Sequence, residues 1–165
     1  MTILRQLRGH TFSALAVAGV MTASFGLMSG AANAGTCPAG EVTTDGQKPG
    51  ATAHANVTDK VIASIDLADE ALKLKDHKFR LRQLVVQPGG VVAWHSHEER
   101  PAIIYIVSGS IVEFASTCAV PIVHSAGDVA RETHTTKHWW KNTSKKPAVL
   151  LSADILHDKM DPHTM

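Results

Sequence analysis

The stretch PGGVVAWHSHEER, residues 88–100, decides the fold of this chain. Turn residues are followed by an apolar run and then by two histidines, His95 and His97, with one residue between them. On a β-strand, side chains two positions apart point to the same face, and their Cα atoms lie about 6.7 Å apart. The two imidazoles can therefore converge on one metal ion, although such a pair alone is more often surface or hydrogen-bonded histidines.

Short apolar stretches separated by turn residues continue on both sides of this segment. Explicit turn sequences stand at 88–90, 108–110, 126–128 and 142–144, and the stretches between them lack a helical stripe of useful length. The pattern predicts an all-β fold, a mainly antiparallel sandwich or barrel of about nine strands. The predicted strands are 61–67, 79–87, 91–97, 102–107, 111–115, 121–124, 128–132, 138–141 and 148–155.

A second cluster strengthens the interpretation of the histidine pair. Gly127 opens a strand, and HWWKN, residues 138–142, forms the next segment but one. Together the two clusters resemble the two motifs of the cupin superfamily, in the same order and with similar spacing. The first motif, Gly-x5-His-x-His-x3–4-Glu-x6-Gly, is matched by Gly89, His95, His97 and Gly109, and the ends of the second by Gly127, His138 and Asn142.

The resemblance covers roughly residues 61–155. It implies a cupin-like double-stranded β-helix, a jelly-roll barrel, with a divalent transition metal at His95, His97 and His138. Three neutral imidazoles suit Fe, Ni, Cu or Zn and, less well, Mn, so the identity of the metal stays open. Trp140 has the strand parity of His138 and would face the interior, either as a wall of the pocket or as core filling.

The first motif lacks its glutamate. The position falls on Ala102, or on Pro101 with the shorter spacing, and neither side chain binds a metal. Ala102 would leave room in the pocket for a water molecule, the simplest fourth ligand, or for a substrate. Glu99 and His134 are the remaining candidates for an extra ligand, although such residues in a turn are more often exposed.

Three further residues receive simpler interpretations. Arg100, next to two glutamates, is read as a surface ion pair, with a role on the pocket rim as the alternative. His124 stands beside a turn, where a turn contact is expected. His54 falls in a segment without large apolar residues and is assigned no role.

Residues 1–34 are typical of a secretory signal peptide. Two arginines precede an uncharged apolar run, residues 12–27, and the segment ends in Ala-Asn-Ala, the small residues that signal peptidase requires. The run falls short of the ~20 residues that span a bilayer, so a membrane anchor is the weaker interpretation. We expect an exported protein, periplasmic or secreted, that begins at Gly35 and contacts no membrane after signal removal.

The mature chain is expected to have an extended N-terminal arm at 35–60 and a β-barrel domain at 61–165. Its two cysteines are Cys37 in the arm and Cys118 in the middle of the domain. Exported compartments are oxidising, so we expect these cysteines to form a disulfide that ties down the arm. Two unpaired thiols are the alternative, because the sequence does not show that they come within bridging range.

The charge balance favours a small molecule as partner. Without the signal segment the chain holds 14 Lys and Arg against 15 Asp and Glu, which gives no reason to expect nucleic acid. Small cupins commonly pair, so a homodimer is compatible with the resemblance. Two functions stay open: a metal-dependent oxygenase of a small organic substrate, as in cupin dioxygenases with three histidines, or a noncatalytic small-molecule or metal-binding cupin.

Overall fold

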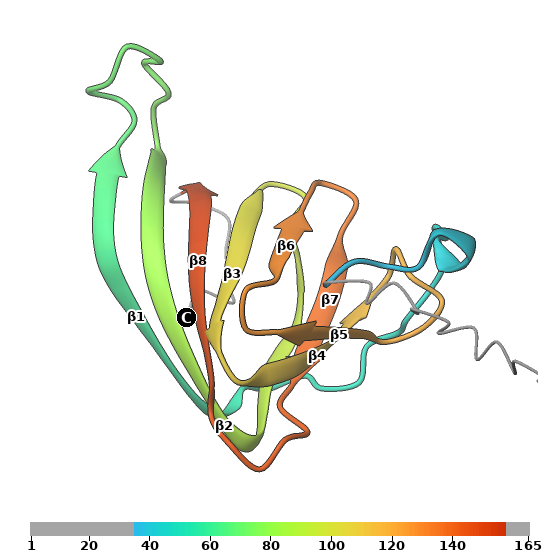
Figure 1. The fold of residues 1–165 in the computed structure, drawn as a ribbon. Coiled ribbons are helices and arrows are strands. Elements are labelled where there is room, and N and C mark those ends of the chain that lie inside the picture. The colour runs from blue at the N-terminus through green and yellow to red at the C-terminus, as the bar shows by residue number, and fades with distance from the viewer. Residues whose placement is uncertain (1–34, 158–165) are drawn as a thin grey trace, which may run out of the picture. The chain divides into compact units, whose positions relative to one another are not determined.

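The computed structural model describes residues 35–157, so the predicted signal peptide lies outside the described residues. All paired strands are antiparallel, and they run in the order β5-β4-β7-β2-β8-β3-β6, with β1 added on β2. This sheet curls into a nearly closed barrel, the double-stranded β-helix that the motifs predict (Figure 1). The elements are η1 Ala39–Glu41, β1 Ala55–Asp66, β2 His77–Ser96, β3 Ala102–Ser108, β4 Ser110–Ala115, β5 Ile122–Ser125, β6 Val129–Glu132, β7 Lys137–Lys141 and β8 Ala148–His157.

Strict alternation along the strands builds the barrel interior. In β4, for example, every second residue is buried, which places Ile111, Glu113 and Ala115 inside. Side chains on one face of a strand share one environment, so the inward residues of neighbouring strands form one core. The apolar part of this core consists of Leu84, Val86, Val92, Ile104, Ile106, Ile111, Ala130, Trp140, Ala148 and Leu150.

Two predicted boundaries are wrong. The Pro-Gly-Gly sequence at 88–90 does not separate two strands, because β2 continues through it and changes partner from β8 to β7. Gly89 has a φ of +74°, and its N–H donates to the carbonyl of Asn142. In addition, β1 begins at Ala55 rather than at residue 61. The residues of β1 are mostly exposed and pair through their backbone, so hydropathy gave no signal for its start.

The predicted turns at the other three positions join consecutive strands. Gly109 connects β3 to β4 with a φ of +79°, and a Cβ atom there would lie 2.4 Å from the carbonyl oxygen of Pro147. Asn142, which follows β7, is fully buried. Its amide nitrogen donates to the carbonyls of Val86 and Lys146, each at 2.8 Å, and its oxygen accepts from the N–H of Ser144. The two motif residues are thus explained by turn geometry.

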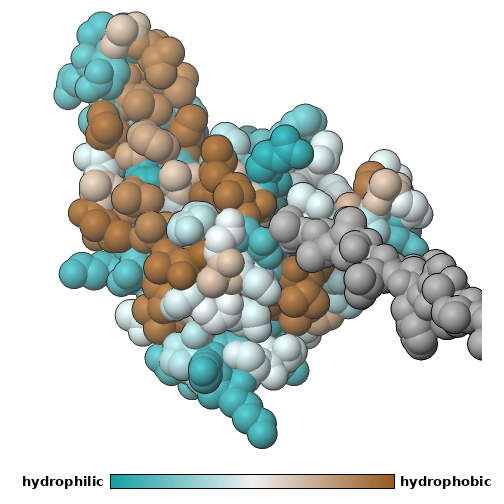
Figure 2. Space-filling view, in the orientation of Figure 1, coloured by the Kyte–Doolittle hydropathy of each residue, from teal (hydrophilic) through white to brown (hydrophobic). Residues whose placement is uncertain are grey.

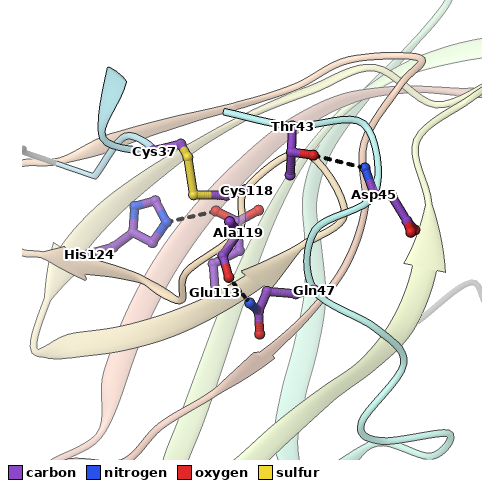
Figure 3. The surroundings of a disulfide bond; sticks show 8 residues. All are labelled: Cys37, Thr43, Asp45, Gln47, Glu113, Cys118, Ala119 and His124. Atoms are coloured by element: carbon purple, nitrogen blue, oxygen red, sulfur yellow. Dashed lines mark hydrogen bonds and ion pairs between the residues drawn. A yellow bond between two sulfur atoms is a disulfide. The ribbon is translucent and has the colours of Figure 1, made fainter. Parts of the chain in front are cut away.

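The N-terminal arm is fastened to the segment that follows β4. Cys37 and Cys118 form the predicted disulfide (Figure 3). Backbone hydrogen bonds from Thr43 and Gly46 to the carbonyls at 117 and 116 continue this attachment. Further along, the N–H of Trp94 donates to the carbonyl of Ala51. Within residues 35–157 there is no helix long and apolar enough to cross a membrane.

Candidate metal centre

The structure brings the three predicted histidines together. His95 and His97 stand at the end of β2, and His138 on β7 is the register partner of His95. The Nε2 atoms are 3.0 Å apart for His95 and His97, 2.9 Å for His97 and His138, and 3.1 Å for His138 and His95. His97 and His138 are buried, and His95 is partly exposed.

Hydrogen bonds on the opposite ring nitrogens orient all three imidazoles. Nδ1 of His95 lies 2.8 Å from the carbonyl oxygen of Ala93, and Nδ1 of His97 lies 2.7 Å from that of Arg100. Nδ1 of His138 lies 2.6 Å from a carboxylate oxygen of Glu113. Because these oxygens accept hydrogen bonds, they favour the tautomer with the proton on Nδ1. Three Nε2 lone pairs then face one another, and this arrangement fits a cation between them.

The spacing of the donors also indicates a coordination geometry. Nitrogen ligands at right angles around an ion, each about 2.1 Å from it, are about 3.0 Å apart, whereas tetrahedral ligands are about 3.4 Å apart. The observed separations of 2.9–3.1 Å match the right-angle case. The three histidines would then hold one ion and leave room on it for water or a substrate.

The protonation of the cluster differs from ring to ring. Burial, together with the charge of His138 and of the other neighbours, lowers the pKa of His95 far below its usual value and that of His97 to about 2. Burial acts in the same direction on His138, but the carboxylates of Glu132 and Glu113 raise the pKa of His138 above its usual value. In the metal-free protein, a proton on this cluster therefore belongs to His138.

Two buried carboxylates lie behind His138. Glu113 on β4 accepts from His138 and, at 2.8 Å, from Nε2 of His124 on β5. Burial alone would raise the pKa of Glu113, but these hydrogen bonds hold the pKa at about 2. Glu132 on β6 lies 3.4 Å from Nδ1 of His138, and burial raises the pKa of Glu132 to about 8. With His138, the two glutamates form a second group of close potential ligand atoms.

A cavity inside the barrel opens onto the three histidines. Its wall is partly apolar and includes two arginines, and no aspartate or glutamate of residues 35–157 is among its lining residues. One of them, Arg82, is held by ion pairs to Asp59 and Asp154. The residues that line the cavity are His54, Arg82, Leu84, Val92, His95, His97, Arg100, Ile104, His138, Trp140, Leu150 and Ser152.

Of the other predicted site residues, only one lines the cavity. Trp140 lines the cavity and packs edge-on against the ring of His138. Ala102 is buried on β3 but is not among the residues that line the cavity; its register partners are Glu132 and Asp154. Glu99 and His134 are exposed and do not belong to the cluster of the three histidines.

Two of the simpler interpretations are wrong, and several site residues were missed. The side chain of Arg100 is buried at the cavity rather than on the surface, and His124 is fully buried in β5 rather than in a turn contact. Glu113 carries a recognisable signal, because it stands at an inward position of a strand between apolar residues, whereas Glu132 ends its strand after Arg131. His54 carries none, because its place in the arm gives no strand parity.

The chain is similar to a known family and to several solved structures. Residues 82–154 match the family described as the cupin domain. A search of curated proteins gives no match. A double-stranded β-helix protein from Klebsiella pneumoniae is similar with a TM-score of 0.49 and 15% identity, over 64% of this chain and 81% of that chain. KdgF from Halomonas sp. has a TM-score of 0.47 and 19% identity, over 60% and 78%.

A third similar structure is a predicted oxalate decarboxylase from Thermotoga maritima. It has a TM-score of 0.46 and 22% identity, over 70% of this chain and 97% of that chain. The family match spans both histidine motifs and most of the barrel strands. Residues 82–154 therefore match the cupin domain, and the chain carries the double-stranded β-helix that its two motifs predict.

Proposed function

We propose that this cupin domain binds one divalent transition metal through His95, His97 and His138, and uses it as an oxygenase of a small organic anion. The observation that carries the proposal is the convergence of three Nε2 atoms, all within 3.1 Å of one another, on the wall of a cavity. A redox-active ion such as Fe(II) would supply the activation of dioxygen. The right-angle spacing favours six-coordinate ions such as Fe(II), Ni(II) or Mn(II) over tetrahedral Zn(II).

The charge of the cavity supports an anionic substrate. The three histidines are neutral as ligands, so the metal would keep its full positive charge, and Arg100 adds a further positive charge to the same wall. Asp59 and Asp154 hold Arg82 in place. Arginine side chains on the wall of a cavity donate charge-assisted hydrogen bonds to carboxylates. A small carboxylate that also reaches the open face of the metal is therefore the substrate class that we propose.

The remaining wall of the cavity would shield the reacting groups from water. Leu84, Val92, Ile104 and Leu150 supply aliphatic surface, and Trp140 supplies an aromatic face. Exclusion of water strengthens the attraction between an anion and the charges of the site. Noncatalytic binding of the same anion is the alternative, which is favoured by the absence of any aspartate or glutamate from the lining that could act as a general base.

Metal analysis of purified variants tests the proposal. We expect about one ion per chain in the wild type and a large loss in His95→Ala and His97→Ala, because each variant lacks one of the three donors. His77→Ala is the matched control, since His77 is also on β2 but packs against His157 instead. Circular dichroism must show that each variant is folded. Equal metal content in all proteins would contradict the proposal.

A second measurement separates the oxygenase from the binding protein. Dioxygen uptake is followed with the Fe(II)-loaded wild type and a panel of small carboxylates. Uptake that depends on a carboxylate and is lost in His95→Ala supports the oxygenase. Saturable binding of a carboxylate without uptake supports the noncatalytic alternative.

We also propose that the protein is exported and cleaved after Ala34. The Cys37–Cys118 disulfide supports this, because disulfides persist mainly in oxidising compartments. N-terminal sequencing and intact mass of the protein recovered from the exporting cell test it. A chain that keeps residues 1–34, or that is recovered with two free thiols, would contradict it.

A homodimer is proposed from the outer face of the barrel. Apolar side chains lie next to one another across β2, β8 and β3: Phe79 pairs with Ile155, and Tyr105 pairs with Leu151. Phe79 and Tyr105 are exposed, and apolar residues gather over β1, β2 and β8 in Figure 2. Contiguous apolar patches of this kind mark protein contacts. Light scattering should give twice the mass of the chain in the wild type and the mass of one chain in Tyr105→Lys; a monomeric wild type would contradict the proposal.

A further inference from the structure

A second cavity lies on the far side of His138 from the metal ligands. The arm closes it with Gly35, Thr36 and Cys37, and the buried carboxylates Glu113 and Glu132 line its inner wall. Asp128 lies close to Gly35, and Arg131 also lines the cavity. Figure 3 shows the disulfide of Cys37 close to the hydrogen bond between His124 and Glu113. The start of the predicted mature chain is thus held against the groups that orient a metal ligand.

Gly35 fits this place because it has no side chain. It is buried, with a φ of +58°, and a Cβ atom there would lie 2.6 Å from Nδ1 of His124 and 2.9 Å from Cβ of Asp128. Cβ contacts below 3.0 Å require a neighbour to move, and positive φ values disfavour other residues. The backbone nitrogen of Gly35 is bonded to the same Cα, so it lies in the immediate neighbourhood of the His124 ring.

His124 offers an acceptor at this point. Its Nε2 donates to Glu113 at 2.8 Å, and this assigns the proton of the neutral ring to Nε2. Nδ1 is therefore left with a lone pair, and it is buried without a hydrogen-bond partner among the described residues. Buried polar atoms without a hydrogen-bond partner are rare in folded proteins, so we expect a donor to bind Nδ1 of His124.

We propose that cleavage after Ala34 supplies this donor. Hydrolysis of the Ala34–Gly35 peptide bond consumes one water molecule and leaves a carboxylate on Ala34 and an ammonium group on Gly35. The ammonium group donates to Nδ1 of His124, whose other ring nitrogen donates to the carboxylate of Glu113. This inference rests on the proposed cleavage after Ala34, and it assigns a binding site to the new N-terminus.

The site connects processing to the metal centre through three hydrogen bonds. The ammonium group donates to His124, His124 donates to Glu113, and Glu113 accepts from Nδ1 of His138 at 2.6 Å. Chains of hydrogen bonds polarise one another, and partners of a metal ligand tune its affinity. In the unprocessed chain, Gly35 carries only an amide N–H, without a charge. The processed form should therefore differ in metal affinity from a chain with an extra residue at its start, because His124 and His138 share the Glu113 carboxylate.

The reactivity of the N-terminal amine tests the proposal on metal-free protein. The comparison variant has one alanine inserted between Ala34 and Gly35, so that its mature chain begins one residue earlier; N-terminal sequencing verifies both starts. Acetylation of the N-terminus is followed by mass spectrometry, with each protein both folded and unfolded in denaturant. We expect the folded wild type to react about tenfold or more slowly than the folded variant, because an N-terminus held against the buried ring of His124 is less accessible to the reagent.

Equal rates in the two folded proteins, or an exported chain that begins at another residue, would overturn the proposal. Because no metal is present in this assay, its outcome is independent of whether the three histidines bind one. Metal titration of the same two proteins then tests the connection to His138. A several-fold difference in metal affinity between the two proteins supports the connection, and equal affinity would contradict it.

Discussion

Nδ1 of His138 and a carboxylate oxygen of Glu113 lie 2.6 Å apart, the shortest of the hydrogen bonds that orient the three imidazoles. Both residues are buried, on the neighbouring strands β7 and β4. The carboxylate holds the Nδ1 proton, directs the Nε2 lone pair toward His95 and His97, and makes the ring a stronger donor. Glu113, which lies outside both cupin motifs, therefore sets the orientation and the tautomer of His138, which belongs to the second motif.

The first prediction follows from this pair. Glu113→Gln should weaken metal binding by about 10–100-fold, because the amide lacks the negative charge that orients His138 and increases its basicity. Competition against a chelator of known affinity measures the change. Glu98→Gln is the matched control, since Glu98 is exposed, and its affinity should equal that of the wild type. Equal affinities for Glu113→Gln and the wild type would show that the hydrogen bond has no role in metal binding.

The second prediction concerns pH. The pKa values of His95 and His97 are lowered, so these rings stay neutral in mild acid, whereas the pKa of His138 is raised and its ring holds a proton. One proton therefore competes with the metal, and affinity should fall about tenfold for each pH unit below about pH 6. Three ordinary histidines, each with a pKa of about 6.5, would give a fall of about 500-fold between pH 6 and pH 5. Titrations at about pH 5 and pH 6 distinguish the two cases.

The raised pKa of His138 also affects the stability of the fold. A group whose pKa is raised in the folded state stabilises the fold at pH values below its unfolded pKa, and this contribution is lost as the pH rises through the folded pKa. His138 in the metal-free protein is such a group. Bound metal replaces the proton, so added metal should raise the melting temperature more at pH 8 than at pH 6. A larger rise at pH 6 would contradict the assignment.

The third prediction concerns the anion. Arg100→Met should weaken the binding of malonate to the metal-loaded protein, while its metal affinity stays unchanged, because the carbonyl that His97 uses belongs to the backbone. Loss of a charge-assisted hydrogen bond of this kind reduces affinity by about tenfold or more. Malonamide, which has the same size without charge, is the control ligand. If malonate and malonamide bind equally well to the wild type, the cavity does not select anions.

The fourth prediction tests the turn between β3 and β4. Gly109→Ala should lower the free energy of unfolding by about 1–3 kcal/mol, because the φ of Gly109 is positive and the new methyl group would meet the carbonyl of Pro147. Gly40→Ala is the matched control, since a Cβ atom at Gly40 would have nothing within 4 Å. Denaturant unfolding measures both. Equal effects of the two substitutions would contradict the role assigned to the turn.

The sequence predicts the barrel and the three histidines because both depend on local spacing. His95 and His97 share a strand face, and the turns at Gly109 and Gly127 have positive φ values that their glycines permit. By contrast, the long strand β2 could not be predicted, because the Pro-Gly-Gly sequence within it is typical of a chain reversal. Hydropathy does not show that a strand can bend there and exchange one neighbour for another.

The surroundings of the histidines depend on contacts between distant segments. Glu113 is 25 residues from His138 in the sequence, and His54 reaches the cavity from the arm through a hydrogen bond to Ala93. Ala102 occupies the position of the missing motif glutamate and was predicted to leave room in the pocket. In the structure it pairs with Glu132 and Asp154 on the neighbouring strands instead. Strand parity shows that a residue points inward, but only the register between strands shows which inward residues meet.

X-ray absorption at the metal edge tests the central claim most directly. With one Fe(II) or Co(II) per chain, the account predicts three imidazole nitrogens at about 2.1 Å in a six-coordinate site, and two imidazoles in His97→Ala. The spectrum of His77→Ala should equal that of the wild type. A wild-type spectrum with fewer than three imidazoles, or one that His97→Ala leaves unchanged, would contradict the assignment of His95, His97 and His138 as the metal centre.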